Sequence, residues 1–334
     1  MIHWRIERVV HFAPGEFVKT GLAHFGFHDR AGHYYGVAHQ KHFLGAVGPD
    51  GSLLWTLSGT PVLSGVPNIE ADLRFPMYVD SLPDGTLVVS NFGNAHLYRV
   101  DVGAMKASLM VKGSTIAMTD MGNCVVDAQG HIWVNEVTGC RVWRFDPTGR
   151  PVQVIGDGRA GFQLGTTNYA DTRFSWIYDI RLGPDGNIYV LDSRNFALRM
   201  IDLGEGAVTT LAGNGTPGYA GDGEAARTAT FGGDPTARFD GPISLSLDEE
   251  GNIYVGDRFN HVVRMIERTN GIISTIAGHR EVGKEDPTDP SERDPLAANL
   301  PQISSMDYYK DLLLVPTDLG PESGDLVVLR KNRA

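Results

Sequence analysis

The chain has 334 residues, of which 42% are hydrophobic and 21% charged, so it can bury a large core and is not a disordered segment. Its net charge of −11 argues against nucleic-acid or anionic-membrane binding, because both need basic patches. The two cysteines cannot form a disulfide framework. Neither an 18-residue apolar run nor a signal-peptide core is found in the sequence, so we expect a cytoplasmic protein.

A six-fold repeat follows the first residues of the chain. Each copy has an apolar segment, Asp-x-x-Gly-Asn or a variant of it, Ile-Tyr-Val or Ile-Trp-Val, a polar turn and an apolar segment carrying Arg. In chain order the copies occupy residues 29–47, 81–101, 125–146, 181–202, 246–267 and 308–319, and the first and last are degenerate. Repeats at a spacing of 45 to 65 residues predict a fold built from similar, stacked units.

Each copy predicts a small antiparallel sheet. Asp-Gly and Gly-Asn pairs supply the positive φ angles of tight hairpins, and Val, Ile, Tyr and Trp suit half-buried strands. A four-stranded sheet cannot cover both of its faces alone, whereas six sheets around an axis cover one another. We therefore expect an all-β six-bladed propeller as one domain, residues 1–334, with blades beginning near residues 20, 74, 120, 174, 240 and 300. A parallel β-helix or two sandwiches would need a shorter period or unlike halves.

The two ends of the chain are expected to share one blade. The last repeat offers three strands, at residues 302–308, 312–316 and 325–329, while residues 2–12 precede the first repeat and have no sheet of their own. We expect residues 1–12 to supply the outer strand of the last blade, because that blade would otherwise keep an open edge.

The repeats resemble those of the NHL-repeat β-propellers. The segment GNIYVGDRFNHVVRMI at residues 251–266 is similar to that family's repeat core, and TLAGNGTPGYAGDGEAA at 210–226 is similar to an inter-blade loop of its bacterial members. The resemblance extends over residues 122–278. It implies a propeller fold but leaves the function open, because this fold serves receptors, scaffolds, lyases and hydrolases.

Candidate site residues come from the innermost strand of each blade, which should line the axis. Counting back from each turn glycine brings Asp80, Asp179 and Arg181 to the axis, with Arg181 able to hold a substrate carboxylate or polar oxygen. We expect catalytic roles for these three with His24 and Tyr178 at the channel mouth. The expected substrate-binding residues are Trp176, Tyr78, Asn123 and Phe174.

No metal or other cofactor is expected. Calcium-dependent propeller lactonases and phosphotriesterases place Glu, Asn and Asp ligands around the channel mouth, where this sequence has Gly122, Tyr178 and Ile243. The peptidyl-amidating lyases, which are also NHL-like, hold zinc through three histidines, of which only His24 has a match. The pair His39 and His42 has no third partner and is a weak metal motif.

Structural roles compete with functional ones. Asp179 and Arg181 could form an ion pair that only stabilises the fold. The recurring residues Asp192, Asp257, Arg199 and Arg264 favour blade scaffolding, because catalysis rarely needs several copies. Cys124 and Cys140 are expected to be reduced core residues.

Long inter-blade segments, at residues 58–74, 156–174, 213–240 and 278–300, favour a pocket at the channel mouth. We therefore expect the chain to bind or transform a small polar molecule by acid–base chemistry, as a lyase, hydrolase or isomerase. The alternative is a non-catalytic propeller that binds a protein partner, with an exposed patch and an inert channel.

Overall fold

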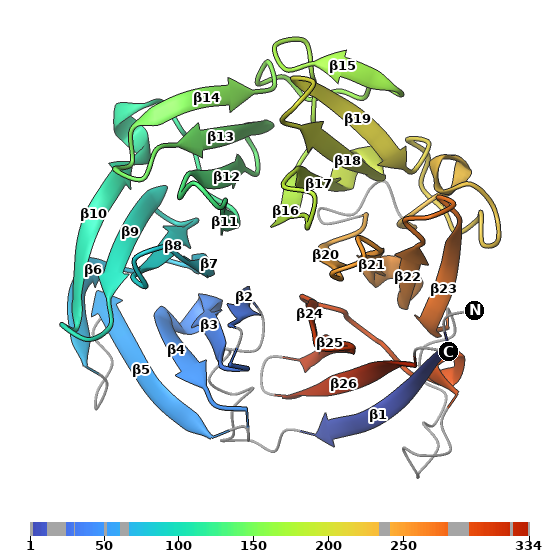
Figure 1. Ribbon diagram of the computed structural model, residues 1–334, viewed down its shortest axis with the longest axis horizontal. Helices are drawn as coiled ribbons and strands as arrows, with labels where there is room; N and C mark the ends of the chain where they lie inside the picture. Colours follow the sequence, from blue (N-terminus) through green and yellow to red (C-terminus); the bar gives the residue numbers. More distant parts are fainter. Residues whose placement is uncertain are drawn as a thin grey trace. The chain divides into compact units, whose positions relative to one another are not determined.

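The protein is an all-β six-bladed propeller, as the repeats predict (Figure 1). The computed structural model describes residues 3–11, 25–29, 31–49, 52–60, 67–233, 241–279, 294–320 and 323–332. The chain divides into two compact units: unit 1 comprises Met1–Glu16, Phe162–Thr167 and Gly183–Ala334, and unit 2 comprises Phe17–Gly161 and Asn168–Leu182. None of the described helices is long or apolar enough to cross a membrane.

Unit 2 holds the first three blades and the first strand of the fourth repeat. Neighbouring strands are antiparallel, except that β6 runs parallel to β5. The blades are β2 (Phe25–His28), β3 (Tyr34–Ala38), β4 (Phe43–Val47), β5 (Leu53–Thr60) and β6 (Asn68–Asp72); β7 (Pro76–Ser81), β8 (Leu87–Asn91), β9 (His96–Asp101) and β10 (Lys106–Lys112); and β11 (Cys124–Val126), β12 (Ile132–Glu136), β13 (Arg141–Phe145) and β14 (Pro151–Ile155), followed by β16 (Ile177–Leu182).

Unit 1 holds the rest of the fourth repeat and the last two blades. Its strands are β17 (Ile188–Asp192), β18 (Ala197–Asp202) and β19 (Ala207–Ala212); β20 (Ser244–Leu247), β21 (Ile253–Asp257), β22 (Val262–Ile266) and β23 (Ile273–Gly278); and β24 (Asp307–Tyr309), β25 (Leu312–Gly320), β26 (Ser323–Asn332) and β1 (His3–His11). Strand β15 (Thr166–Asn168) spans the boundary between the units.

The predicted sharing of one blade by the two chain ends is confirmed. Strand β1 pairs antiparallel with β26, with Trp4 opposite Lys331 and Ile6 opposite Leu329 (Figure 1). Ile6 is only 4% exposed and belongs to the same apolar cluster as Leu329 and Leu313. The N-terminal strand therefore covers the edge that β26 would otherwise expose.

The repeated Asp-x-x-Gly phrase folds into a turn that the aspartate locks. Asp127 accepts hydrogen bonds from backbone N–H groups of its own turn and from Nε1 of Trp133 at 3.1 Å, while Gly130 adopts the positive φ of 81° that the turn requires. The lock ties the hairpin to the aromatic residue of the next strand. It recurs between Asp248 and Tyr254 at 2.7 Å. In the fourth repeat Gly183 takes the position of the aspartate, and Asp185, directly before the turn glycine, accepts the Tyr189 hydroxyl at 3.0 Å instead.

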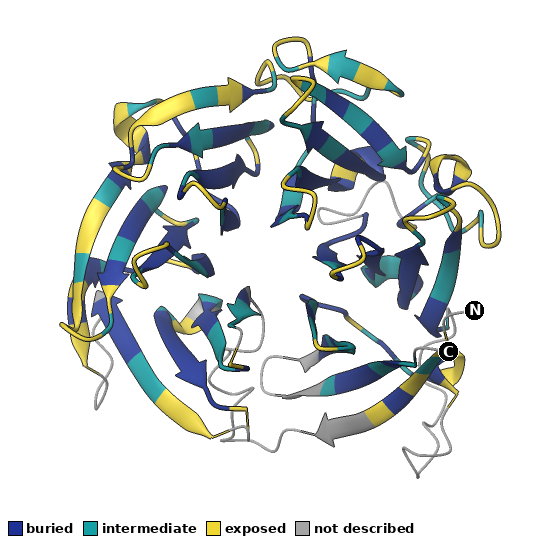
Figure 2. Ribbon diagram, in the orientation of Figure 1, coloured by how far each residue is buried: buried dark blue, intermediate teal, exposed yellow. Residues whose placement is uncertain are grey.

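The core lies on both faces of the middle strands. Every residue of β8, β12, β17 and β21 is buried, and Figure 2 shows these strands in dark blue. Outer strands such as β10 and β14 carry mostly exposed or half-buried residues. This pattern follows from stacking, because neighbouring sheets cover the middle of each blade and leave its outer strand in water.

The recurring acids and arginines take part in the scaffold. The buried Arg199 donates from Nη1 to Oδ2 of Asp192 at 3.3 Å. The equally buried Arg264 donates to the backbone oxygens of Thr230 and Ala220, each at 2.9 Å, and so fixes the glycine-rich segment before β20. Cys124 and Cys140 are buried and form no disulfide with each other, as expected.

Candidate functional site

The candidate site is a group of polar side chains on the innermost strands of unit 2. Strand β11 lies beside β7 and β16 (Figure 1). Residues two apart on a strand point to the same face, so β7 presents Tyr78 with Asp80 and β16 presents Asp179 with Arg181. Asn123, directly before β11, completes the group.

Asp179 and Arg181 form a buried ion pair. Their exposed fractions are 2% and 8%, and Nη1 of Arg181 lies 2.7 Å from Oδ1 of Asp179. The same carboxylate oxygen accepts a hydrogen bond from Nδ2 of Asn123 at 2.5 Å. Burial of either charge alone would be costly, so pairing explains how both are tolerated inside the protein.

Tyr78 links this pair to the first blade. The guanidinium carbon of Arg181 lies 4.6 Å from the centre of the Tyr78 ring, a cation–π contact. The Tyr78 hydroxyl donates to the backbone oxygen of Gly26 at 2.6 Å. Arg181 is therefore held by a carboxylate and by an aromatic face that is itself anchored.

Asp80 has a different environment. Its two oxygens accept backbone N–H groups of Ser81 at 2.7 Å and Val126 at 2.8 Å. Desolvation by the surrounding protein raises the pKa of Asp80 to about 6, against the opposing effects of these two hydrogen bonds and of Arg181. The residue nevertheless keeps partial exposure. It can therefore gain or lose a proton close to neutral pH.

A second asparagine belongs to the group and was missed from the sequence. Asn135 of β12 donates from Nδ2 to the backbone oxygen of Ile177 at 2.8 Å, and its backbone N–H donates to Asn123 at 3.3 Å. A Cβ atom at Gly122 would lie 2.2 Å from Nδ2 of Asn135, so the glycine makes room for this amide. The sequence carried a signal for Asn135. A polar amide stands there at a middle-strand position where the fourth repeat has the apolar Leu191.

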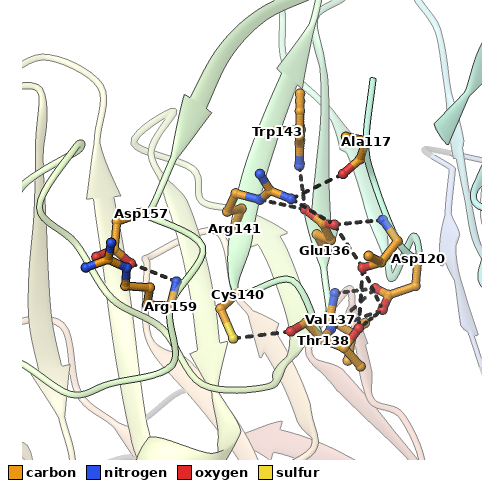
Figure 3. Close-up of polar contacts among 11 residues, drawn as sticks. Ala117, Asp120, Glu136, Val137, Thr138, Cys140, Arg141, Trp143, Asp157 and Arg159 are labelled. Atoms are coloured by element: carbon orange, nitrogen blue, oxygen red, sulfur yellow. Dashed lines mark hydrogen bonds and ion pairs between the residues drawn. The ribbon is translucent and has the colours of Figure 1, made fainter. Parts of the chain in front are cut away.

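A polar network surrounds Glu136, the residue that follows Asn135 in the chain (Figure 3). Glu136, next to Asn135, accepts hydrogen bonds from Nε of Arg141 at 2.8 Å, Nε1 of Trp143 at 2.9 Å and the backbone N–H of Thr119 at 2.8 Å. Burial would raise the pKa of Glu136, but these bonds outweigh it and leave the pKa below its ordinary value. The network ties the segment before Gly122 and Asn123 to the end of β12.

Asp120 extends the same network. It accepts the backbone N–H of Val137 at 2.6 Å and the hydroxyl of Thr138 (Figure 3). Burial raises the pKa of Asp120 despite these hydrogen bonds. Asp120 is 5% exposed and accepts hydrogen bonds from Val137 and Thr138. We therefore infer that it stabilises the loop and does not take part in chemistry.

The predicted residues Tyr178, Phe174 and Trp176 lie elsewhere on β16 or just before it. Tyr178 lies between Ile177 and Asp179 on β16, so its side chain points to the opposite face from Asp179. Phe174 is fully buried and Trp176, which has a φ of 57°, is half-buried just before β16. His24 lies outside the described residues.

His39 and His42 have hydrogen-bonding roles. His39 Nδ1 lies 3.1 Å from the backbone oxygen of Pro76, and His42 Nδ1 accepts the backbone N–H of Phe75 at 3.1 Å. Both therefore hold the segment that leads into β7. In the part of the chain that the structure describes, no three His, Cys, Asp or Glu side chains are grouped closely enough to hold a metal ion.

Sequence comparisons match only a part of the chain. No family model matches the chain. A stretch of 104 residues is 32% identical to the Arabidopsis thaliana protein SUPPRESSOR OF QUENCHING 1, chloroplastic, covering 31% of this chain and 9% of that protein. The chain thus spans about a tenth of that protein's length.

Several solved structures share the architecture. A protein of unknown function from Bacteroides thetaiotaomicron has a TM-score of 0.65 at 14% identity, covering 98% of this chain and 76% of its own. Virginiamycin B lyase from Staphylococcus aureus has a TM-score of 0.56 at 14% identity, with 98% and 88% covered. A luciferin-regenerating enzyme has a TM-score of 0.60 at 11% identity, with 97% and 96% covered. At these identities the likeness establishes the six-bladed fold and leaves the function to the site itself.

Proposed function

We propose that this chain is an NHL-type propeller that binds a small polar molecule at the inner strands of unit 2 and transforms it by acid–base chemistry, as a lyase, hydrolase or isomerase. The observation that carries the proposal is Asp80, a half-buried residue whose carboxyl pKa is raised to about 6 beside the buried cation Arg181. Perturbed acids of this kind are concentrated at functional sites.

The two aspartates take different roles in this proposal. Asp80 is the proton acceptor, because its pKa is close to neutral pH and its oxygens bind backbone donors rather than a cation. Asp179 is a positioning residue, because it is committed to Arg181 and Asn123. Arg181, paired with Asp179, lies close enough to Asp80 for its charge to lower the pKa of that carboxyl and to limit the rise that desolvation causes.

The structural relatives are consistent with such a role. Two of the similar structures are enzymes by name, a lyase and a luciferin-regenerating enzyme. Another, from Bacteroides thetaiotaomicron, is described as an auxiliary nutrient binding protein, with a TM-score of 0.63 at 14% identity and with 94% of this chain and 70% of its own covered. Small-molecule binding therefore occurs on this architecture both with and without chemistry.

The test is to incubate the protein with a fractionated extract of small metabolites and to follow each compound by mass spectrometry. We expect a compound to be depleted by the wild type but not by Asp80→Asn or Arg181→Met. Exposed residues of unit 2 provide matched controls, Asp101→Asn and Arg150→Met. An unchanged extract, with no compound retained by the protein, would refute the proposal.

A protein-interaction propeller is the second candidate. It is favoured by exposed apolar side chains on or beside the outer strands of unit 2, namely Leu53, Leu54, Met105, Leu109 and Val152. This reading predicts that no compound is depleted or retained, and that the inner-strand variants alter stability alone.

A further inference from the structure

The candidate site contains buried acceptor oxygens that no described donor meets. Asn123 and Asn135 are 1% and 0% exposed, and Oδ1 of each lacks a hydrogen-bond donor among the described residues. Each amide nitrogen is used, by Asp179 and by the backbone of Ile177 respectively. An unmet buried acceptor is costly, so such atoms are expected to receive a hydrogen bond from an ordered water or from a bound molecule.

The nearby cation is already engaged. Arg181 lies 2.7 Å from Asp179 and packs against the Tyr78 ring at 4.6 Å. Asp80, which feels the charge of Arg181, adds a further carboxyl. When Asp80 is ionised, these three ionisable groups carry one net negative charge. A ligand carboxylate or phosphate would therefore be repelled, whereas a donor group would be attracted.

We infer that the site takes a ligand that donates hydrogen bonds and carries no anionic group, an amine or a polyol, whose N–H or O–H groups meet Asn123 Oδ1, Asn135 Oδ1 and Asp80. This inference rests on the proposed function, because it names the ligand class of the same site. It reverses the expectation from the sequence that Arg181 holds a substrate carboxylate, since Asp179 occupies that position instead.

Three probes with the same two-carbon stem separate the ligand classes: ethanolamine, ethylene glycol and glycolate. Their binding to the wild-type protein is measured by saturation-transfer NMR at neutral pH. We expect ethanolamine to bind best and ethylene glycol to bind detectably. Glycolate should bind at least about tenfold more weakly than ethanolamine, a difference of about 1.4 kcal/mol.

Variants locate the binding. Asn123→Leu and Asn135→Leu remove the acceptor oxygens at similar volume, and each should weaken ethanolamine binding about tenfold. Asn91→Leu is the matched control, because Asn91 is also 0% exposed with an unmet Oδ1 but lies at the end of β8, away from β16. Its binding of ethanolamine should be unchanged. The wild-type ranking of the probes does not depend on any variant folding.

The outcomes separate this inference from the proposed function. Glycolate binding as tightly as ethanolamine overturns the ligand class, as does ethanolamine binding that survives both asparagine variants, which would mean that ordered water alone satisfies these oxygens. If glycolate binds and Arg181→Met abolishes it, the proposed site stands with an anionic ligand. Failure of all three probes also overturns the ligand class, and the metabolite-extract experiment then decides the proposed function.

Discussion

Asp80 and Asp179 show how neighbours decide the chemistry of two like residues. Both lie on innermost strands of unit 2, but Asp179 has an arginine at 2.7 Å, whereas Asp80, among the described residues, accepts hydrogen bonds from backbone donors. Desolvation therefore dominates at Asp80 and pairing dominates at Asp179. One carboxyl is suited to exchange a proton, and the other to hold a cation in place.

The raised pKa of Asp80 predicts a pH dependence of stability. The ordinary value is 3.8 and the folded value is about 6, so the folded state binds more protons between these pH values. The stabilisation is complete below pH 4 and is lost as pH rises through 6. Between pH 4 and pH 8 the unfolding free energy of wild type relative to Asp80→Asn should fall by roughly 1–3 kcal/mol.

Urea unfolding of both proteins across this pH range measures the effect. Asp101→Asn, at the exposed end of β9, serves as the control and should follow the wild type. Parallel curves for wild type and Asp80→Asn would show that Asp80 titrates as an ordinary aspartate.

The buried ion pair predicts a coupled pair of variants. Arg181→Met should strand the carboxylate of Asp179 and lower the unfolding free energy by about 3–5 kcal/mol. Adding Asp179→Leu removes the stranded charge and should restore much of that loss. Denaturant melts of the two single variants and the double variant give the coupling energy, and additive losses would contradict the buried pair.

For single residues, the sequence predicts which side chains share one face of a strand better than it predicts which residues of other strands they contact. Alternation along the chain puts Asp179 and Arg181 on one face, and their 2.7 Å contact agrees. Asn135 was missed because it lies in a middle strand, where the repeat predicts core. Its role depends on contacts with Gly122 and Ile177, which belong to neighbouring segments.

At the scale of elements, the sheets follow from the repeat because each copy carries its own turn and strand signals. Strands β6 and β15 were not predicted, since they lie in connections that do not repeat. The pairing of β1 with β26 was predicted by counting strands. Counting strands could not predict which side chains of β26 contact the rest of unit 1.

Lys331 is one of those side chains. It is 5% exposed, and its Nζ lies 2.7 Å from Oδ2 of Asp248 and also contacts Glu250, both in the turn before β21. Lys331→Met should leave Asp248 buried without its cation and cost about 3–5 kcal/mol. Arg330→Met, which removes a more exposed contact with Glu7, should cost under about 1 kcal/mol. Equal losses in the two variants would argue against this role for Lys331.

Deletion of β1 should destabilise the protein more than these single substitutions. Removal of residues 1–12 deletes β1 and leaves β26 with an open edge. We expect a marked fall in melting temperature, or aggregation, because an exposed strand edge pairs readily with other chains. Ile6→Ala, which truncates one buried side chain of β1, is the milder comparison and should cost about 2–5 kcal/mol. A truncated protein that melts with the wild type would refute this role of β1.

At the scale of the whole molecule, a net charge of −11 attracts cations in general, but tight binding needs several ligands that converge. The described residues contain no such group, and His39 and His42 are occupied by backbone contacts at the entry to β7. We therefore expect the purified protein to hold no stoichiometric zinc or calcium, and dialysis against a chelator to leave its melting temperature unchanged. Elemental analysis by mass spectrometry tests the first expectation and calorimetry the second. One equivalent of tightly bound metal would contradict them, and alanine variants of His24, His39 and His42 would then show whether the first blade supplies its ligands.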